Sequence, residues 1–164
     1  MKRHPELHPL SEHHHHVLVM ALEIRRAGES SAPDRDQRLR ALAESLLRFW
    51  EESGRTHFAE EEQVLLPQYA RHFRLDEDPE IMRMLADHAA IRAKMEDVKD
   101  CLGGGVAPEP LIEMVIEPVI ELGRMLHDHV RLEEDRIFPR IEKALSEIEL
   151  NSVGSRVTRL HGGK

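Results

Sequence analysis

Two stretches of the chain repeat one pattern: His57-Phe-Ala-Glu-Glu-Glu-Gln-Val-Leu-Leu-Pro67 and His129-Val-Arg-Leu-Glu-Glu-Asp-Arg-Ile-Phe-Pro139. In each, a glutamate follows the histidine by four residues and a proline follows it by ten. Residues four apart lie on one face of an α-helix, so the imidazole and the carboxylate can bind one metal ion. A single copy is explained as well by an ordinary pair on a solvated helix face. Two copies that both end in two apolar residues and proline favour metal binding.

Apolar residues recur at threes and fours on both sides of these stretches, which predicts amphipathic helices. Ser11 is a candidate N-cap of the first helix, and Asp78-Pro79 is a strong start signal for the third. Pro67 should disturb the backbone of the second helix, and Pro118 and Pro139 that of the fourth. The expected helices are Ser11–Ala27, Asp34–Pro67, Asp78–Leu102 and Pro108–Leu145, with a short fifth helix in 146–160.

These elements predict an all-α protein, an up-down-up-down four-helix bundle with a short C-terminal helical tail. The expected organisation is a flexible N-terminus at 1–9, the bundle at 10–145 and the tail at 146–164. In a bundle of this kind, metal ions are bound by side chains from facing helices.

The helix before each repeated stretch offers a further histidine. Four consecutive histidines occupy 13–16, inside the chain and directly before an apolar stripe, so they are not an expression tag. His14 shares the helix face of Leu10 and Val17 and is the preferred ligand, with His15 as the alternative. His88 lies on the apolar face of the third expected helix.

Two facing motifs of this kind describe a dinuclear site, because each carboxylate can bridge two ions. Imidazole and carboxylate without thiolate suit iron, with zinc or manganese as alternatives. Two octahedral irons offer about 12 coordination positions, of which the bridging carboxylates and four histidines fill about eight. The remaining positions are open to water, hydroxide or a diatomic ligand such as oxygen or nitric oxide.

Four segments carry a resemblance to a known family: Leu10-Ser11-Glu12-His13-His14, His57-Phe-Ala-Glu-Glu61 with Leu66-Pro67, Asp87-His88-Ala-Ala-Ile-Arg92, and His129-Val-Arg-Leu-Glu133-Glu134 with Ile137-Phe138-Pro139. They resemble the hemerythrin-like HHE cation-binding family over about Leu10 to Leu145. The resemblance implies a four-helix bundle with a non-haem, oxo- or hydroxo-bridged di-iron centre that binds or senses oxygen, redox state or a related diatomic. The ligands that it implies are His14, His57, Glu61, His88, His129 and Glu133.

Other residues near these positions have alternative roles. Oxygen-carrying members have a second histidine one helical turn after the third-helix ligand, where this chain has Arg92, which argues against simple oxygen carriage. Glu134 is the main rival of Glu133 as a ligand. Trp50 lies two turns before His57 on the same helix face and is a further candidate beside the site. Ser53 and Gly54, one turn before His57, are small and either leave a pocket for a diatomic ligand or reflect plain core packing.

No catalytic acid, base or nucleophile is identified, so the sequence favours a binding or sensing protein over an enzyme. A di-iron oxidase, peroxidase-like or nitric-oxide-handling enzyme, an iron store and a structural zinc bundle remain alternatives. Fold analogy alone does not decide among them.

Composition narrows the partners and the compartment. A formal net charge of −8 argues against nucleic acid as a partner. The single Cys101 excludes an intramolecular disulfide, and no apolar run is long enough to span a bilayer, so we expect a cytoplasmic protein. The sequence leaves open whether the fourth helix faces solvent or another copy in a homo-oligomer.

Overall fold

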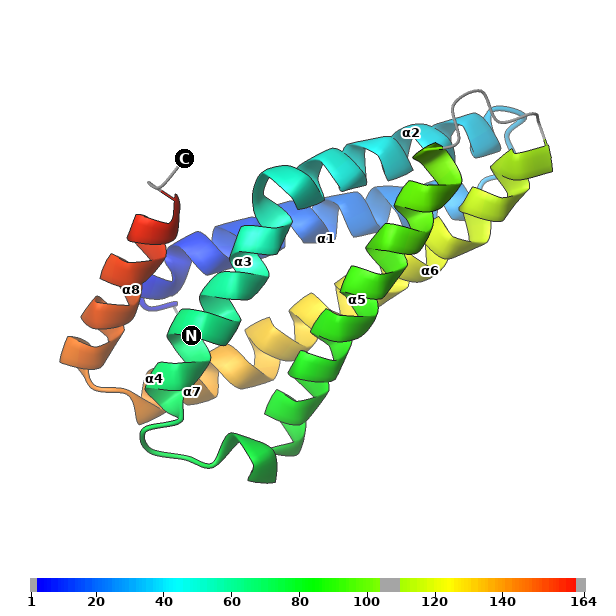
Figure 1. Ribbon diagram of the computed structural model, residues 1–164. Coiled ribbons are helices and arrows are strands. Elements are labelled where there is room, and N and C mark those ends of the chain that lie inside the picture. Colours follow the sequence, from blue (N-terminus) through cyan, green and yellow to red (C-terminus); the bar gives the residue numbers. More distant parts are fainter. Residues whose placement is uncertain (1–2, 104–109, 162–164) are drawn as a thin grey trace.

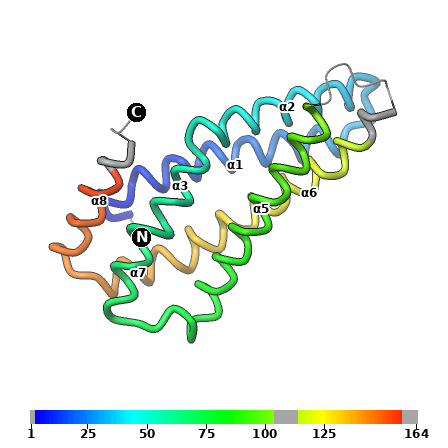
Figure 2. The backbone as a smooth tube through the Cα atoms, in the orientation of Figure 1, coloured from blue at the N-terminus to red at the C-terminus, as the bar shows by residue number. Residues whose placement is uncertain are grey.

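The computed structural model describes residues 3–103 and 110–161, and all its regular structure in these ranges is helical (Figure 1). The all-α prediction is confirmed. Four long helical segments run beside one another, and a further helix lies across one end (Figures 1 and 2).

The first helix begins earlier than the sequence predicted. A short 3-10 turn, η1 (Pro5–Leu7), leads directly into α1 (His8–Gly28). Ser11 is therefore inside the helix and not its N-cap. Its hydroxyl instead donates to Oε1 of Glu134 at 2.7 Å, a contact between distant segments that local sequence does not reveal.

The second long segment contains two π-helical turns. Its elements are α2 (Arg35–Phe49), η2 (Trp50–Gly54), α3 (Arg55–Glu60), η3 (Glu61–Leu65) and α4 (Leu66–Tyr69). The predicted disturbance at Pro67 takes the form of η3, whose closing bond runs from the N–H of Leu66 to the carbonyl of Glu61. Proline has no N–H and clashes with the carbonyl of the preceding turn, which favours the wider turn before it.

The third and fourth segments follow the predicted order. A 3-10 turn, η4 (Leu75–Glu77), precedes α5 (Pro79–Gly103), and the Asp78 carboxylate caps α5 by accepting from the N–H groups of Glu80 and Ile81. The fourth segment consists of α6 (Pro110–Leu132), η5 (Glu133–Ile137) and α7 (Phe138–Ala144). The expected start of the fourth helix at Pro108 lies outside the described residues.

The core consists of two apolar clusters with a polar layer between them. On α1, Leu10 belongs to one cluster and Val17 to the other, and His14 lies between them. On α5, His88 lies in the same way between Met84 and Ile91. The buried polar residues of the bundle therefore meet at one level.

Helices α1 and α6 pack closely because Gly123 has no side chain. A Cβ atom at Gly123 would lie 2.8 Å from Cγ2 of Ile24, closer than real Cβ contacts.

The described part of the N-terminal segment, from Arg3 onward, packs on the bundle. Leu7 is fully buried, and Arg3 forms ion pairs with Glu134 and Glu142. The contacts are with residues more than a hundred positions away, which explains why local pattern did not predict them. Arg3 also donates to the carbonyl of Glu134 at 3.1 Å, in the turn that precedes Pro139.

The predicted fifth helix is present as α8 (Glu147–His161), which lies beside η1 at one end of the bundle (Figures 1 and 2). Arg156 of α8 donates to the carbonyl of Gln63 at 3.1 Å, in the turn that precedes Pro67. Because proline has no backbone N–H, Pro67 and Pro139 each leave a carbonyl of the preceding turn without a hydrogen-bond donor from the helix itself. The two ends of the described chain thus each supply an arginine to one of these turns.

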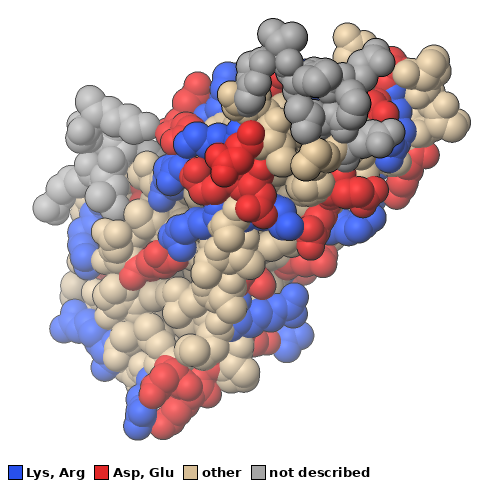
Figure 3. Space-filling model, turned by 45° about the vertical axis from the view of Figure 1, so that its right-hand side comes forward, with Lys and Arg blue, Asp and Glu red and all other residues tan. Residues whose placement is uncertain are grey.

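The surface mixes both signs of charge. On the face in Figure 3, acidic and basic side chains are interspersed and do not separate into areas of one sign. None of the helices in the described ranges combines the length and the apolar character that crossing a membrane requires.

Candidate metal centre

All six side chains that the sequence singled out as ligands meet in the polar layer. They come from four segments: His14 from α1, His57 and Glu61 from α3 and η3, His88 from α5, and His129 and Glu133 from α6 and η5. Each is buried, and Glu61, Glu133 and His88 have no exposed surface. Their polar atoms form two overlapping groups within each of which all atoms lie within 4.8 Å of one another.

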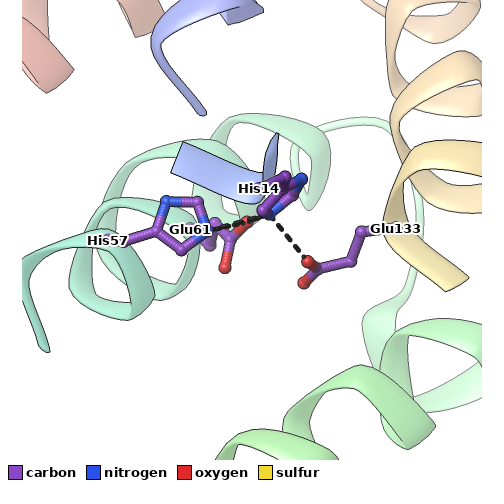
Figure 4. A group of neighbouring side chains, drawn as sticks. All are labelled: His14, His57, Glu61 and Glu133. Atoms are coloured by element: carbon purple, nitrogen blue, oxygen red, sulfur yellow. Dashed lines mark hydrogen bonds and ion pairs between the residues drawn. The ribbon is translucent and has the colours of Figure 1, made fainter. Parts of the chain in front are cut away.

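The first group contains His14, His57, Glu61 and Glu133 (Figure 4). Nε2 of His14 lies 3.0 Å from Oε2 of Glu133 and 3.5 Å from Oε1 of Glu61. Nε2 of His57 lies 3.2 Å from the same Oε1 of Glu61 and 2.9 Å from Nε2 of His14. Two imidazoles and two carboxylate oxygens thus converge.

The second group contains His88, His129 and the same two glutamates. Nε2 of His88 lies 3.3 Å from Oε2 of Glu61 and 3.5 Å from Oε1 of Glu133. Nε2 of His129 lies 3.2 Å from Oε1 of Glu133.

The two carboxylates divide their oxygens between the groups. Oε1 of Glu61 faces the first group and Oε2 faces the second, while Glu133 does the reverse. This is the arrangement that two bridging carboxylates between two ions require.

The donor atoms fit a metal pair because many of them lack another partner. Both oxygens of Glu61 and of Glu133, and Nε2 of His88 and His129, make no hydrogen bond within the described part of the chain. Buried polar atoms are nearly always satisfied, so a converging set that is not satisfied needs an explanation. Cations at the two convergence points would satisfy these atoms, and imidazole with carboxylate suits iron, manganese or zinc.

Without metal, protons balance the buried charges. Burial alone would raise the pKa of Glu61, but the imidazoles of His57, His14 and His88 hold that pKa well below its usual range. Burial alone would lower the pKa of His88, but Glu133 and Glu61 raise it to about 10. Burial alone would likewise lower the pKa of His14. That pKa is raised by three carboxylates, those of Glu133, Glu134 and Glu61. The metal-free centre therefore keeps its carboxylates charged and protonates His14 and His88.

Burial lowers the pKa of His129, the opposite direction to the shifts of His14 and His88. On this account His129 is neutral at pH 7. Its other nitrogen, Nδ1, has no hydrogen-bond partner among the described residues and lies 3.9 Å from Oδ2 of Asp87.

The glutamate after each shared carboxylate contacts a histidine from the other half of the bundle. Oε1 of Glu134 lies 2.7 Å from Nδ1 of His14, and Oε1 of Glu62 lies 2.7 Å from Nδ1 of His88. Glu133, not its rival Glu134, therefore lies in the groups, and Glu134 acts on His14 from outside. Burial alone would raise the pKa of Glu134. Its contacts with His14, Ser11 and Arg3 instead lower that pKa to about 2.

The remaining sequence candidates lie around the groups. His15 is exposed and points away from the polar layer, so His14 is the first-helix histidine that joins it. Arg92 donates to Glu62 at 2.9 Å. Trp50 is buried near His14 and His57.

Sequence reasoning missed three contributors. His13 stacks on His57, with ring centroids 4.0 Å apart, and burial followed by His57 lowers its pKa to about 2. Arg3 and Ser11 contact Glu134 from the N-terminal segment and α1. Of the three, only His13 could have been suspected from the sequence, because it belongs to the run of histidines at 13–16. Arg3 and Ser11 contact a residue that is distant in the sequence.

The prolines of the repeated pattern help to aim the glutamates. Glu61 and Glu133 are each the first residue of a π-helical turn, η3 and η5. Each of these turns ends two residues before the proline of its repeat. A π-helical turn changes the angle at which side chains leave the helix, and such turns are frequent at functional sites.

A small cavity adjoins the first group. Its volume is about 20 Å³, and it is lined by His13, His14, His57 and His129 together with apolar residues that include Trp50 and Phe58. A cavity needs roughly 10–15 Å³ to hold one water molecule. The space is therefore about large enough for a molecule of the size of water.

Comparison with known proteins gives one match. The family model described as the hemerythrin HHE cation binding domain matches residues 7–141, most of the chain. Neither the curated proteins nor the solved structures provide a match.

Proposed function

This chain belongs to the hemerythrin HHE cation-binding domain family, and we propose that its bundle is of the hemerythrin up-down-up-down type and holds two metal ions between its helices. The observation that carries the proposal is the division of the Glu61 and Glu133 oxygens between two pairs of histidines. One ion is assigned to His14 and His57, and the other to His88 and His129. Glu61 and Glu133 would contribute to holding both ions.

We assign iron as the native metal, because imidazole and carboxylate ligands with open positions suit a redox-active pair. Two iron ions would supply one-electron redox chemistry and open positions for a small ligand. The chain's own residues bind the ions, exclude bulk water through the two apolar clusters, and hold protons on Nδ1 of His14 and His88 against Glu134 and Glu62.

The proposed ligand is a diatomic such as oxygen or nitric oxide, and the proposed role is binding or sensing. The cavity of about 20 Å³ beside the first group supports this, since it restricts what can reach the ions from that side. An enzyme that acts on an organic substrate would need a larger space there.

The first experiment is elemental analysis of protein purified without chelator, with ultraviolet and visible spectra recorded before and after dithionite and air. We expect close to two irons per chain and an absorption that changes with oxidation. One zinc per chain, or no metal after iron loading, would overturn the proposal in favour of a structural clasp. Repeated turnover of a substrate with a reductant would favour the di-iron enzyme.

Histidine variants supply the control. His57→Ala and His129→Ala should each lose metal, because each removes one of two imidazoles from a group. His72→Ala should keep the wild-type metal content, since His72 is exposed and pairs with Glu149. Equal metal content in all three variants would contradict the ligand assignment.

A further inference from the structure

We infer that Arg3 and Arg92 are positioning residues of the metal centre: each closes a set of four side chains, Arg-Glu-His-Phe, that fixes one histidine for metal binding. The inference rests on the proposed function, because the histidines concerned are proposed ligands. The two sets are built from different parts of the sequence and have the same contacts.

The first set surrounds His14. Its Nδ1 lies 2.7 Å from Oε1 of Glu134, and its ring stacks on Phe138 with centroids 5.2 Å apart at 24°. Nη2 of Arg3 donates to Oε2 of Glu134 at 2.6 Å, and the same guanidinium lies 5.1 Å from the centre of the Phe138 ring. Ser11 completes the carboxylate's contacts by donating to Oε1 at 2.7 Å.

The second set surrounds His88. Its Nδ1 lies 2.7 Å from Oε1 of Glu62, and its ring stacks on Phe58 with centroids 3.7 Å apart at 14°. Nη2 of Arg92 donates to Oε2 of Glu62 at 2.9 Å, and its guanidinium lies 5.2 Å from the centre of the Phe58 ring.

The same contacts arise from unrelated sequence positions. Arg92 follows His88 by one turn of α5, whereas Arg3 precedes α1 and reaches Glu134 from the N-terminal segment. Local helix geometry accounts for the proximity of Arg92 to His88 but not for that of Arg3 to His14. The same Arg-Glu-His-Phe contacts thus arise from different sequence positions, which indicates that both sets have the same role.

The task is to present Nε2 to the metal. A carboxylate that accepts from Nδ1–H fixes the tautomer, so that the lone pair is on Nε2, and raises the basicity of that nitrogen. Stacking on phenylalanine fixes the plane of the ring. The arginine cancels the charge of the carboxylate and holds it in place, so that the histidine gains a partner without extra negative charge beside Glu61 and Glu133.

A plain surface ion pair is the competing explanation for both arginines, and exposed pairs contribute little to stability. Arg92 is 39% exposed and Arg3 15%. A surface pair would affect neither ion. The positioning role instead predicts that each arginine affects one ion: Arg3 the ion at His14, Arg92 the ion at His88.

The test uses Arg3→Gln, Arg92→Gln and the double variant, loaded with Co²⁺ as the probe metal and titrated with a chelator. Removing an outer partner of a metal ligand typically costs about 10–100-fold in metal affinity. We expect a loss of about tenfold for one of two ions in each single variant and for both in the double variant. The cobalt visible spectrum should change, and Arg92→Lys should recover part of the affinity.

Lys94→Gln is the matched control. Lys94 also lies on α5 and pairs across to α6, with Nζ 2.8 Å from Oε2 of Glu121. It should bind both ions as wild type does, and the metal-free melting temperature of Arg92→Gln should lie close to that of Lys94→Gln. If an arginine variant does not fold, the isosteric Glu62→Gln and Glu134→Gln carry the same test.

Two failures are distinguishable. If the wild-type protein binds no ion pair, the proposed function fails. If the wild type binds two ions and both arginine variants bind them as tightly as Lys94→Gln, the positioning role is wrong and the proposed function stands.

Discussion

At the scale of single residues, Glu133 has a role that no histidine shares. Each histidine faces one group, whereas Oε2 of Glu133 faces His14 and Oε1 faces His88 and His129. Glu133→Gln keeps the shape but replaces one oxygen with a donor that cannot bind metal. We expect it to lose both ions, whereas His129→Ala should retain the ion at His14 and His57.

Metal counted per chain, by elemental analysis after gel filtration, checks this expectation. Glu121→Gln is the control, because it removes an exposed glutamate from the same helix. A Glu133→Gln protein that kept one tightly bound ion would show that the carboxylate does not bridge.

The sequence predicted which residues would meet, but not what surrounds them. The repeated spacing placed His57 with Glu61 and His129 with Glu133, and helical phase chose His14 over His15; the structure brings all of these except His15 together. The role of Arg3 could not be read from the sequence, because its partner Glu134 is 131 residues away. The spacing of residues along the sequence indicates which side chains share a face of one helix, but it does not indicate which side chains of different helices are in contact.

At the scale of the elements, α1 and α6 depend on the absence of a side chain at Gly123. Gly123→Ala would drive a Cβ atom against Cγ2 of Ile24, 2.8 Å away. Overpacking of a close-packed core typically costs about 1–3 kcal/mol. We expect a lower melting temperature, by roughly 2–4 °C for each kcal/mol.

Thermal denaturation followed by circular dichroism measures this effect. Gly103→Ala is the matched control, because nothing lies within 4 Å of a Cβ atom there. The packing account would be wrong if both alanine variants melted together.

Helix existence was predictable at this scale, and helix detail was not. The prolines at 67 and 139 marked disturbances, yet whether a helix breaks, kinks or widens depends on the tertiary contacts available to the freed carbonyls. Here Arg156 and Arg3 supply those contacts, and the helices widen into η3 and η5.

At the scale of the whole molecule, protons and metal ions compete for one centre. A pKa raised to about 10, as for His88, means that the protonated ring stabilises the metal-free fold fully below its ordinary pKa of 6.5. That contribution is lost as the pH rises through 10. The lowered pKa values of Glu61 and Glu133 stabilise the fold above the ordinary carboxyl range and are lost in acid.

The metal-free protein should therefore lose stability as the pH rises from about 6.5 toward 10, whereas the metal-loaded protein should not, since metal binds neutral imidazole. Melting temperatures measured across this range, with chelator and with excess metal, test the prediction. A metal-free melting temperature that did not change above pH 6.5 would contradict the assigned proton positions.

The sharing of two glutamates by two groups also has a consequence for the topology of the unfolded chain. His14 and His57 are separated by 43 residues, so an ion bound by both would close a large loop, as a crosslink does. Loop closure costs entropy that grows only slowly with loop length. Because Glu61 and Glu133 each belong to both crosslinks, an ion that stayed bound would keep their two segments joined after the other had left, so removal of one ion should lower the melting temperature less than removal of both.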